Sequence, residues 1–142
     1  MQHYVNGFLF SPEKTRVALI RKNRPAWQAG RINGIGGKVE PGERPIDAMV
    51  REFAEETGVM LPSDAWHPFV TLSGAGFVIH FYRAFSERIE KVRTVEDEEV
   101  GIYPVAPLPQ EVLHNLHWLI PLALDPKLDP RRVIEVFEGT PG

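Results

Sequence analysis

The sequence predicts an α/β fold in which a mixed β-sheet is sandwiched between helices. Three observations favour this fold. Apolar patterns typical of strands lie on both sides of one strongly amphipathic helix, a second helical pattern follows near the end of the chain, and no linker or repeat interrupts the 142 residues. A chain of this length can bury a core of its own. We therefore expect residues 1–142 to form a single α/β/α domain.

Composition and charge narrow the class of protein. The chain has no cysteine and a formal net charge of −3. Without cysteine it forms neither a disulfide framework nor a thiolate metal site, and its acidic balance argues against broad binding to nucleic acid or anionic membranes. Residues 1–11 show no signal-peptide pattern, and no apolar stretch approaches membrane-spanning length. We expect a cytoplasmic protein that is a monomer or a homodimer.

The first part of the chain predicts two strands. Residues 3–10 and 16–22 have strand-like apolar patterns, and the sequence Ser-Pro-Glu-Lys at 11–14 separates them with a turn. The continuous apolar run at 17–20 indicates that the second strand is buried on both faces of the sheet.

Basic, aromatic and amide residues follow the second strand. Arg21, Lys22 and Arg24 form a basic cluster at its end, which either keeps the surface soluble or contacts phosphate. Trp27 suits either core packing or a platform for a base. Asn33, a polar residue at the entrance to the next loop, is a candidate ligand contact.

A glycine-rich loop, GIGGKVEPGE at residues 34–43, leads into the amphipathic helix. Glycine permits unusual backbone angles and close approach of the backbone to a ligand, and Pro41-Gly42 is a turn signal. Lys38 is long enough to contact a phosphate. The loop alone is equally consistent with an ordinary hairpin that contains a glycine bulge.

The amphipathic helix has clear expected ends. Pro45 suits its first position, because the fixed φ of proline is helical and its missing N–H would be unpaired there. Gly58 suits the residue just after the helix, where a left-handed conformation is common. The apolar residues recur at three- and four-residue steps and should pack on the sheet as one face: Ile46, Met49, Val50 and Phe53.

An acidic row, Glu52, Glu55 and Glu56, runs beside that apolar face. Each like-charged pair at helical spacing costs about 0.2–0.5 kcal/mol, and the C-terminal end of a helix disfavours anions. A hard divalent cation would remove this conflict, since carboxylates are preferred ligands of magnesium and calcium. The alternative is a solvated acidic face that Arg44 and Arg51 neutralise.

After the helix, the patterns predict the remaining elements. They are a hairpin of residues 66–73 and 76–85, a charged irregular segment at 87–99, a short strand at 101–105, a helix at 109–120 that Pro121 ends or kinks, and a last strand at 132–137.

Loop and helix together match the pattern G-x5-E-x7-R-E-U-x-E-E-x-G-U, where U is apolar. The matching residues are Gly37, Glu43, Arg51, Glu52, Phe53, Glu55, Glu56, Gly58 and Val59. This stretch resembles the Nudix hydrolase signature. The resemblance implies a Nudix-type α/β/α sandwich with a central mixed sheet and a catalytic loop–helix–loop. It also implies a Mg²⁺-dependent enzyme, with Mn²⁺ as a substitute, that hydrolyses a nucleoside diphosphate linked to a group X.

The resemblance also implies a role for each residue at a matching position. Glu55 and Glu56 would be the main metal ligands, and the carbonyl of Gly36 would complete the metal shell. Glu52 would be a further ligand or the base that deprotonates water. Arg51 would orient the carboxylates, Glu43 among them.

Three further assignments lie outside the specified positions of the signature. Many family members add one acidic ligand from a later loop, and in the acidic run at 96–99 we choose Glu98. Lys38 would touch phosphate, with Arg21 and Arg24 as further candidates for that contact. Asn33 is a candidate for contact with the substrate, and the candidates for contact with the base are Trp27, Asn115 and Trp118.

The late segment, residues 94–124, resembles the MutT-like branch, which removes pyrophosphate from nucleoside triphosphates, oxidised purine ones of the 8-oxo-dGTP type included. Asn115 and Leu116 replace a pair of base-reading acidic residues, which leaves oxidised-purine specificity open. The alternatives are a pyrophosphatase for ADP-ribose or another nucleotide sugar, an RNA-cap hydrolase, and a non-catalytic nucleotide sensor. Sensors of this kind commonly lose the box carboxylates, all of which this chain keeps: Glu43, Glu52, Glu55 and Glu56.

Overall fold

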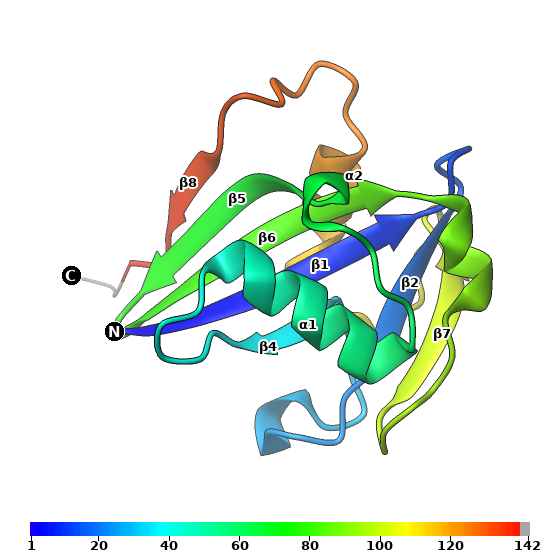
Figure 1. Cartoon of the computed structure of the whole chain (residues 1–142), viewed down its shortest axis with the longest axis horizontal. Helices are drawn as coiled ribbons and strands as arrows, with labels where there is room; N and C mark the ends of the chain where they lie inside the picture. The colour runs from blue at the N-terminus through cyan, green and yellow to red at the C-terminus, as the bar shows by residue number, and fades with distance from the viewer. Residues whose placement is uncertain (140–142) are drawn as a thin grey trace.

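The computed structural model describes residues 1–139 and contains an eight-stranded sheet with one helix on each face (Figure 1). The strand order is β3-β2-β1-β6-β5-β8, while β4 also pairs with β1 and β7 with β2. The α/β sandwich with a mixed sheet is therefore confirmed. In chain order the elements are β1 (Gln2–Phe10), β2 (Arg16–Arg21), β3 (Ile32–Asn33), β4 (Ile35–Lys38), α1 (Pro45–Thr57), β5 (His67–Gly74), β6 (Phe77–Phe85), β7 (Glu99–Pro104), α2 (Leu116–Ala123) and β8 (Ile134–Phe137).

Parallel pairing of β1 with β6 forms the centre of the sheet, and β8 pairs in parallel with β5. Successive side chains of a strand point to opposite faces. Phe8 and Phe10 of β1 therefore join the core under α2, whereas Val5 and Leu9 join the core under α1. The predicted burial of residues 17–20 on both faces is confirmed, because alternate side chains of this run belong to the two cores.

Helix α1 begins and ends as the sequence predicts. Pro45 is its first residue, and Gly58 follows it with a left-handed φ of 77° while its N–H bonds to the carbonyl of Ala54. Met49 and Phe53 are fully buried against the sheet. The flanking residues Ile46 and Val50 pack on the same core. The apolar stripe therefore fixes which side of the helix remains free for the acidic row.

The prediction for the late helix is wrong in its bounds. Helix α2 is Leu116–Ala123, and Pro121 lies within it rather than after it. Residues 109–115 are used differently: Val112 bridges to Ile32 of β3, and the N–H of Leu113 donates to the carbonyl of Ile32. Pairing with the edge of the sheet thus provides hydrogen-bond partners for the backbone of this segment, and the helix begins only at Leu116.

Other boundaries shift by smaller amounts. The hairpin of β5 and β6 is confirmed, the strand expected at 101–105 is β7, and the strand expected at 132–137 is β8. The segment expected to be irregular at 87–99 contains a 3₁₀ helix, Glu87–Lys91, and the glycine-rich segment contributes β4. No helix within residues 1–139 is long and apolar enough to cross a membrane.

Candidate active site

The glycine-rich segment lies directly under the acidic row of α1. It forms β4, which pairs antiparallel with β1 so that Gly37 is opposite Val5. A Cβ atom on Gly36 would lie 1.8 Å from the carbonyl oxygen of Val5, and one on Gly37 would lie 2.6 Å from the carboxylate of Glu52. Glycine is therefore required at Gly36, where backbone atoms leave no room for a Cβ, and at Gly37 it lets the Glu52 carboxylate rest on the strand.

Arg51 links the carboxylates of the signature. Its Nε and Nη2 donate to both oxygens of Glu43 at 2.9 and 3.0 Å, a bidentate pair. Its Nη1 donates to Glu52 Oε1 at 2.9 Å and to Glu55 Oε2 at 3.3 Å, and its Nη2 also donates to the carbonyl of Lys38 at 3.1 Å. The hydrogen bonds from Arg51 lower the pKa of Glu43. One guanidinium thus holds the loop, the strand and the helix together.

An acidic cleft of about 230 Å³ opens between α1 and the loop before β7. Its acidic lining residues are Glu52, Glu55 and Glu56 from α1 and Glu96, Asp97 and Glu98 from the loop. Carboxylates that are far apart in the sequence therefore face one cavity. The structure places all of the predicted carboxylate ligands at this cleft, while Glu43 lies behind it on Arg51.

Of these carboxylates, Glu56 has the least favourable surroundings for a negative charge. Its Oε2 atom is buried without a hydrogen-bond partner among the described residues. Burial raises the pKa of Glu56 to about 8, and the charges of Glu52, Glu98 and Glu96 add to this effect, whereas Lys22 opposes it. Burial also raises the pKa of Glu52, although Arg51 counteracts it. Both groups would be stabilised as anions by a cation in the cleft.

Glu98 is held by the end of β2. It is only 5% exposed, and its carboxylate accepts from Lys22 Nζ at 3.0 Å and from the N–H groups of Asn23 and Arg24 at 2.6 and 3.4 Å. Burial opposes its ionisation, but these hydrogen bonds prevail and lower the pKa of Glu98. Glu98 therefore both faces the cleft and ties the acidic loop to β2.

The donors of the cleft fit a hard divalent cation. The acidic side chains that line it present carboxylate oxygens, the ligand type that magnesium prefers. One of these oxygens, Glu56 Oε2, has no hydrogen-bond partner among the described residues. Within residues 1–139, no group of three or more His, Cys, Asp or Glu side chains is already arranged to hold an ion. Metal binding would therefore have to draw these side chains together.

The predicted phosphate contacts differ in whether their charged groups already have partners in the protein. Lys38 is exposed at the end of β4. Arg21 donates to the carbonyl of Gly30 at 2.9 Å, and Arg24 forms an ion pair with Asp97. Of the basic cluster, Arg21 therefore braces the following loop and Arg24 the acidic one, which leaves Lys38 the freest of the predicted cations.

The predicted base contacts lie on or near β3 and α2. Trp27 is 72% exposed, so the alternative that it packs in the core is wrong. Trp118 is also exposed, on α2. Asn33 Oδ1 accepts from the N–H of Gly34, and Asn115 Oδ1 is buried without a partner among the described residues. Leu116 is fully buried and therefore cannot read a base.

Sequence reasoning missed Asn6. It lies in the middle of β1, where its Nδ2 faces the oxygens of Asn33 and Gly34 at 3.4 Å and its Oδ1 is buried without a described partner. Two acceptors beside Nδ2 fix the orientation of the amide, and its Oδ1 then lies against the Cα side of Gly34. The signal was present, because a lone asparagine interrupts the apolar sequence of the first strand.

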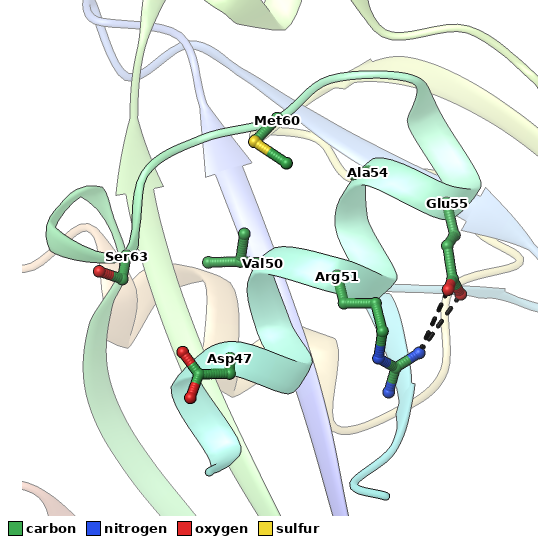
Figure 2. A pocket seen from close by; sticks show the side chains of 7 residues that line it. All are labelled: Asp47, Val50, Arg51, Ala54, Glu55, Met60 and Ser63. Carbon is green, nitrogen blue, oxygen red and sulfur yellow. Dashed lines mark hydrogen bonds and ion pairs between the residues drawn. The ribbon is translucent and has the colours of Figure 1, made fainter. Parts of the chain in front are cut away.

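A second hollow, of about 470 Å³, lies on the outer side of α1 between the helix and the segment that holds Met60 and Ser63 (Figure 2). Val50 and Ala54 form its floor, and the ion pair between Arg51 and Glu55 closes one end. It is shallow and has no convergent set of carboxylates. The acidic cleft is therefore the better candidate for the chemistry.

Comparisons with known proteins identify the family of this chain. The family model of the NUDIX domain matches residues 1–132. The chain therefore belongs to the Nudix family. Its fold and sequence are those of a MutT-like Nudix hydrolase.

Solved structures support the same conclusion. The MutT NUDIX hydrolase from Burkholderia pseudomallei is 26% identical with a TM-score of 0.65, over 85% of this chain and 98% of that one. A MutT structure from work on Aliivibrio salmonicida and Vibrio cholerae is 25% identical with a TM-score of 0.64, over 74% and 81% of the two chains. A MutT/nudix family protein from Enterococcus faecalis shares the fold at 23% identity and a TM-score of 0.65, over 72% of this chain and 43% of that one. A search of curated proteins found no match.

Proposed function

We propose that this protein hydrolyses a phosphate anhydride in a nucleoside diphosphate-X substrate, specifically a nucleoside triphosphate, to the nucleoside monophosphate and pyrophosphate. The observation that carries the proposal is the acidic cleft, in which the helix carboxylates and the acidic loop converge around the partnerless oxygen of Glu56. Repulsion of this kind is relieved by a cation and by the phosphates that a cation brings with it.

Mg²⁺ is the proposed cofactor, and Mn²⁺ could substitute for it. Glu52, Glu55 and Glu56 would hold it, with the carbonyl of Gly36 and, from the acidic loop, Glu98. When bound, the ion shields the charge of the phosphates and makes water easier to deprotonate.

The chain's own residues would then direct the reaction. Glu52 accepts the proton of the attacking water, whose oxygen bonds to phosphorus as the bond to the leaving phosphate oxygen breaks. Arg51 keeps Glu52 and Glu43 in place, and Lys38 binds a phosphate oxygen. The substrate's base would be held by Trp27, Asn115 and Trp118, and Asn33 would be a further substrate contact.

A panel of nucleotides with and without Mg²⁺ tests the proposal. Purified protein is incubated with ordinary and oxidised nucleoside triphosphates and with ADP-ribose, and the products are identified by chromatography and ³¹P NMR. Equimolar monophosphate and pyrophosphate from a triphosphate would support it. AMP and ribose phosphate as the only products would favour the nucleotide-sugar alternative, and tight nucleotide binding without turnover would favour a sensor.

A further inference from the structure

Strand β8 forms an open edge of the sheet. It is last in the strand order, and within residues 1–139 no strand pairs with its outer side (Figure 1). Phe137 is 72% exposed and Ile134 39% exposed, and Val133 just before the strand is also exposed. An open edge that carries exposed apolar side chains is a template for pairing with another strand.

The backbone of β8 shows which groups are free for such pairing. The N–H of Glu138 donates to the carbonyl of Ser73 in β5 at 2.8 Å. Because backbone groups alternate in direction along a strand, the N–H groups of Phe137 and Glu135 point away from β5. The residues that can bond outward are therefore Val133, Glu135 and Phe137.

We propose that β8 is a dimer interface, at which it pairs antiparallel with β8 of a second copy about a two-fold axis at Glu135. In an antiparallel pair, residues whose backbone groups point outward must face residues of the same kind on the other strand. The two-fold axis must therefore lie at one of these residues or midway between two of them. Centred on Glu135, the pairing places Val133 opposite Phe137 of the partner subunit, and Ile134 opposite Val136 of the partner subunit. The sheet then continues from one copy into the other.

Charge supports this register over its neighbours. With the axis at Glu135, Arg132 lies opposite Glu138 of the partner subunit, and this attractive pair occurs twice. An axis at Ile134 would place Arg132 opposite Val136 of the partner subunit, and an axis at Val136 would place Ile134 opposite Glu138 of the partner subunit. Of these three registers, only the axis at Glu135 matches apolar with apolar and opposite charges with each other.

One contact in this interface is unfavourable. The two copies of Glu135 face each other, and like charges directly opposite on paired strands are destabilising. The paired segment is also short, residues 132–138, whereas stable interfaces involve about 20–30 residues a side. We therefore expect a weak dimer with a dissociation constant in the micromolar range, which forms as the concentration rises.

Sedimentation equilibrium over a wide concentration range tests the dimer, with substitutions chosen for the register. Arg132→Glu alone and Glu138→Arg alone should each raise the dissociation constant at least about fivefold, and the double variant should restore it. Glu135→Gln should lower the constant about twofold to fivefold by removing the like-charge contact. Arg131→Glu, the same charge change one residue away from the matched pair, is the control and should have the smaller effect.

A backbone variant completes the test. Glu135→Pro removes one outward N–H and should abolish the dimer, while circular dichroism shows that the fold persists. The interface is remote from the acidic cleft, so the nucleotide hydrolysis measured on each variant should not change. A single monomeric species at concentrations up to about 1 mM would overturn the proposal. So would a dimer that is indifferent to Glu135→Pro and to the charge exchange.

Discussion

Among the carboxylates of the signature helix, Glu56 has the highest electrostatic cost of carrying a charge. A buried polar atom without a partner costs about 1–3 kcal/mol, and the Oε2 of Glu56 is such an atom among the described residues. Neighbouring carboxylates increase the cost of its charge. The protein without a cation is therefore less stable than its fold allows, and this deficit is expected at a site built for a charged ligand.

Removing the charge of Glu56 should make the cation-free protein more stable at alkaline pH. Its folded pKa is raised from 4.5 to about 8. The protonated form is thus favoured by the fold, and the associated stability is present below about pH 4.5 and lost as the pH rises through about 8. Glu56→Gln should remove this loss and raise the melting temperature above pH 8 by at least about 2–4 °C.

Thermal unfolding across pH without divalent cations checks this expectation. The wild type should lose stability from about pH 5 to about pH 9, and Glu56→Gln should lose less. Added Mg²⁺ should stabilise the wild type by mass action and the variant less. A wild-type melting temperature that does not fall over this range would contradict the account of Glu56.

Asn115 offers a second prediction at this scale. Its Oδ1 is buried without a described partner beside exposed Trp118 on α2. Hydrogen bonds built into a site discriminate between substrates far more sharply than apolar contacts do. Asn115→Ala should therefore change the order of kcat/KM for a panel of purine and pyrimidine triphosphates, with the metal requirement unchanged. If every nucleotide lost the same factor, Asn115 would be structural.

At the scale of elements, the packing of α1 on β4 determines where Glu52 lies. The carboxylate rests on the open side of Gly37, so even one methyl group at that position must push it away. Gly37→Ala should lower kcat by about 100-fold, because displacements of about 1 Å at a reacting group can cost this much. Circular dichroism should be unchanged. Gly139→Ala, where a Cβ would meet nothing within 4 Å, is the control. Unaltered turnover in Gly37→Ala would contradict the assigned position of Glu52.

The link between β2 and the acidic loop gives a prediction on stability. Lys22 and Glu98 form a largely buried ion pair at 3.0 Å. Lys22→Met would leave the Glu98 charge without its ammonium partner and should cost about 1–3 kcal/mol of unfolding free energy. Arg24→Met removes the exposed pair with Asp97 and should cost about 0–1 kcal/mol. Denaturant unfolding compares them, and equal losses would refute the idea that burial decides.

The elements differ in how far the sequence predicts them. Helix α1 is predictable because Pro45, Gly58 and the apolar stripe all give the same local signal. The bounds of helix α2 are not, because the start of its pattern is used for pairing with Ile32 of β3, a contact between distant parts of the chain. The path of the glycine-rich segment as β4 is equally non-local, since β1 provides its partner.

The same distinction applies to the candidate site. Its helix carboxylates could be named from their spacing and from the family resemblance. The hydrogen bonds of Glu98 with Lys22 and Asn23 could not be, because they depend on how the acidic loop returns to β2. The exposure of Trp27 could not be predicted from the sequence either, since tryptophan is more often buried.

At the scale of the whole molecule, the sheet separates the acidic cleft on one face from the residues proposed to hold the base, which lie toward the other face. On one face α1 and Ile20 of β2 line the acidic cleft, and the loop before β7 closes its side. On the other face α2 and its preceding segment join β3, near the residues proposed to hold the base. The substrate would therefore lie across the edge of the sheet at β3 and β4, with its phosphates toward α1.

The most direct test of the central claim is the rate of nucleoside triphosphate hydrolysis by Glu56→Gln with saturating Mg²⁺. The matched control is Glu90→Gln, which neutralises an exposed carboxylate paired with Arg16 away from the cleft. Glu56→Gln should lose at least about 100-fold in kcat, whereas Glu90→Gln should keep the wild-type rate and products. Wild-type turnover by folded Glu56→Gln would contradict the assignment of the acidic cleft as the hydrolytic site.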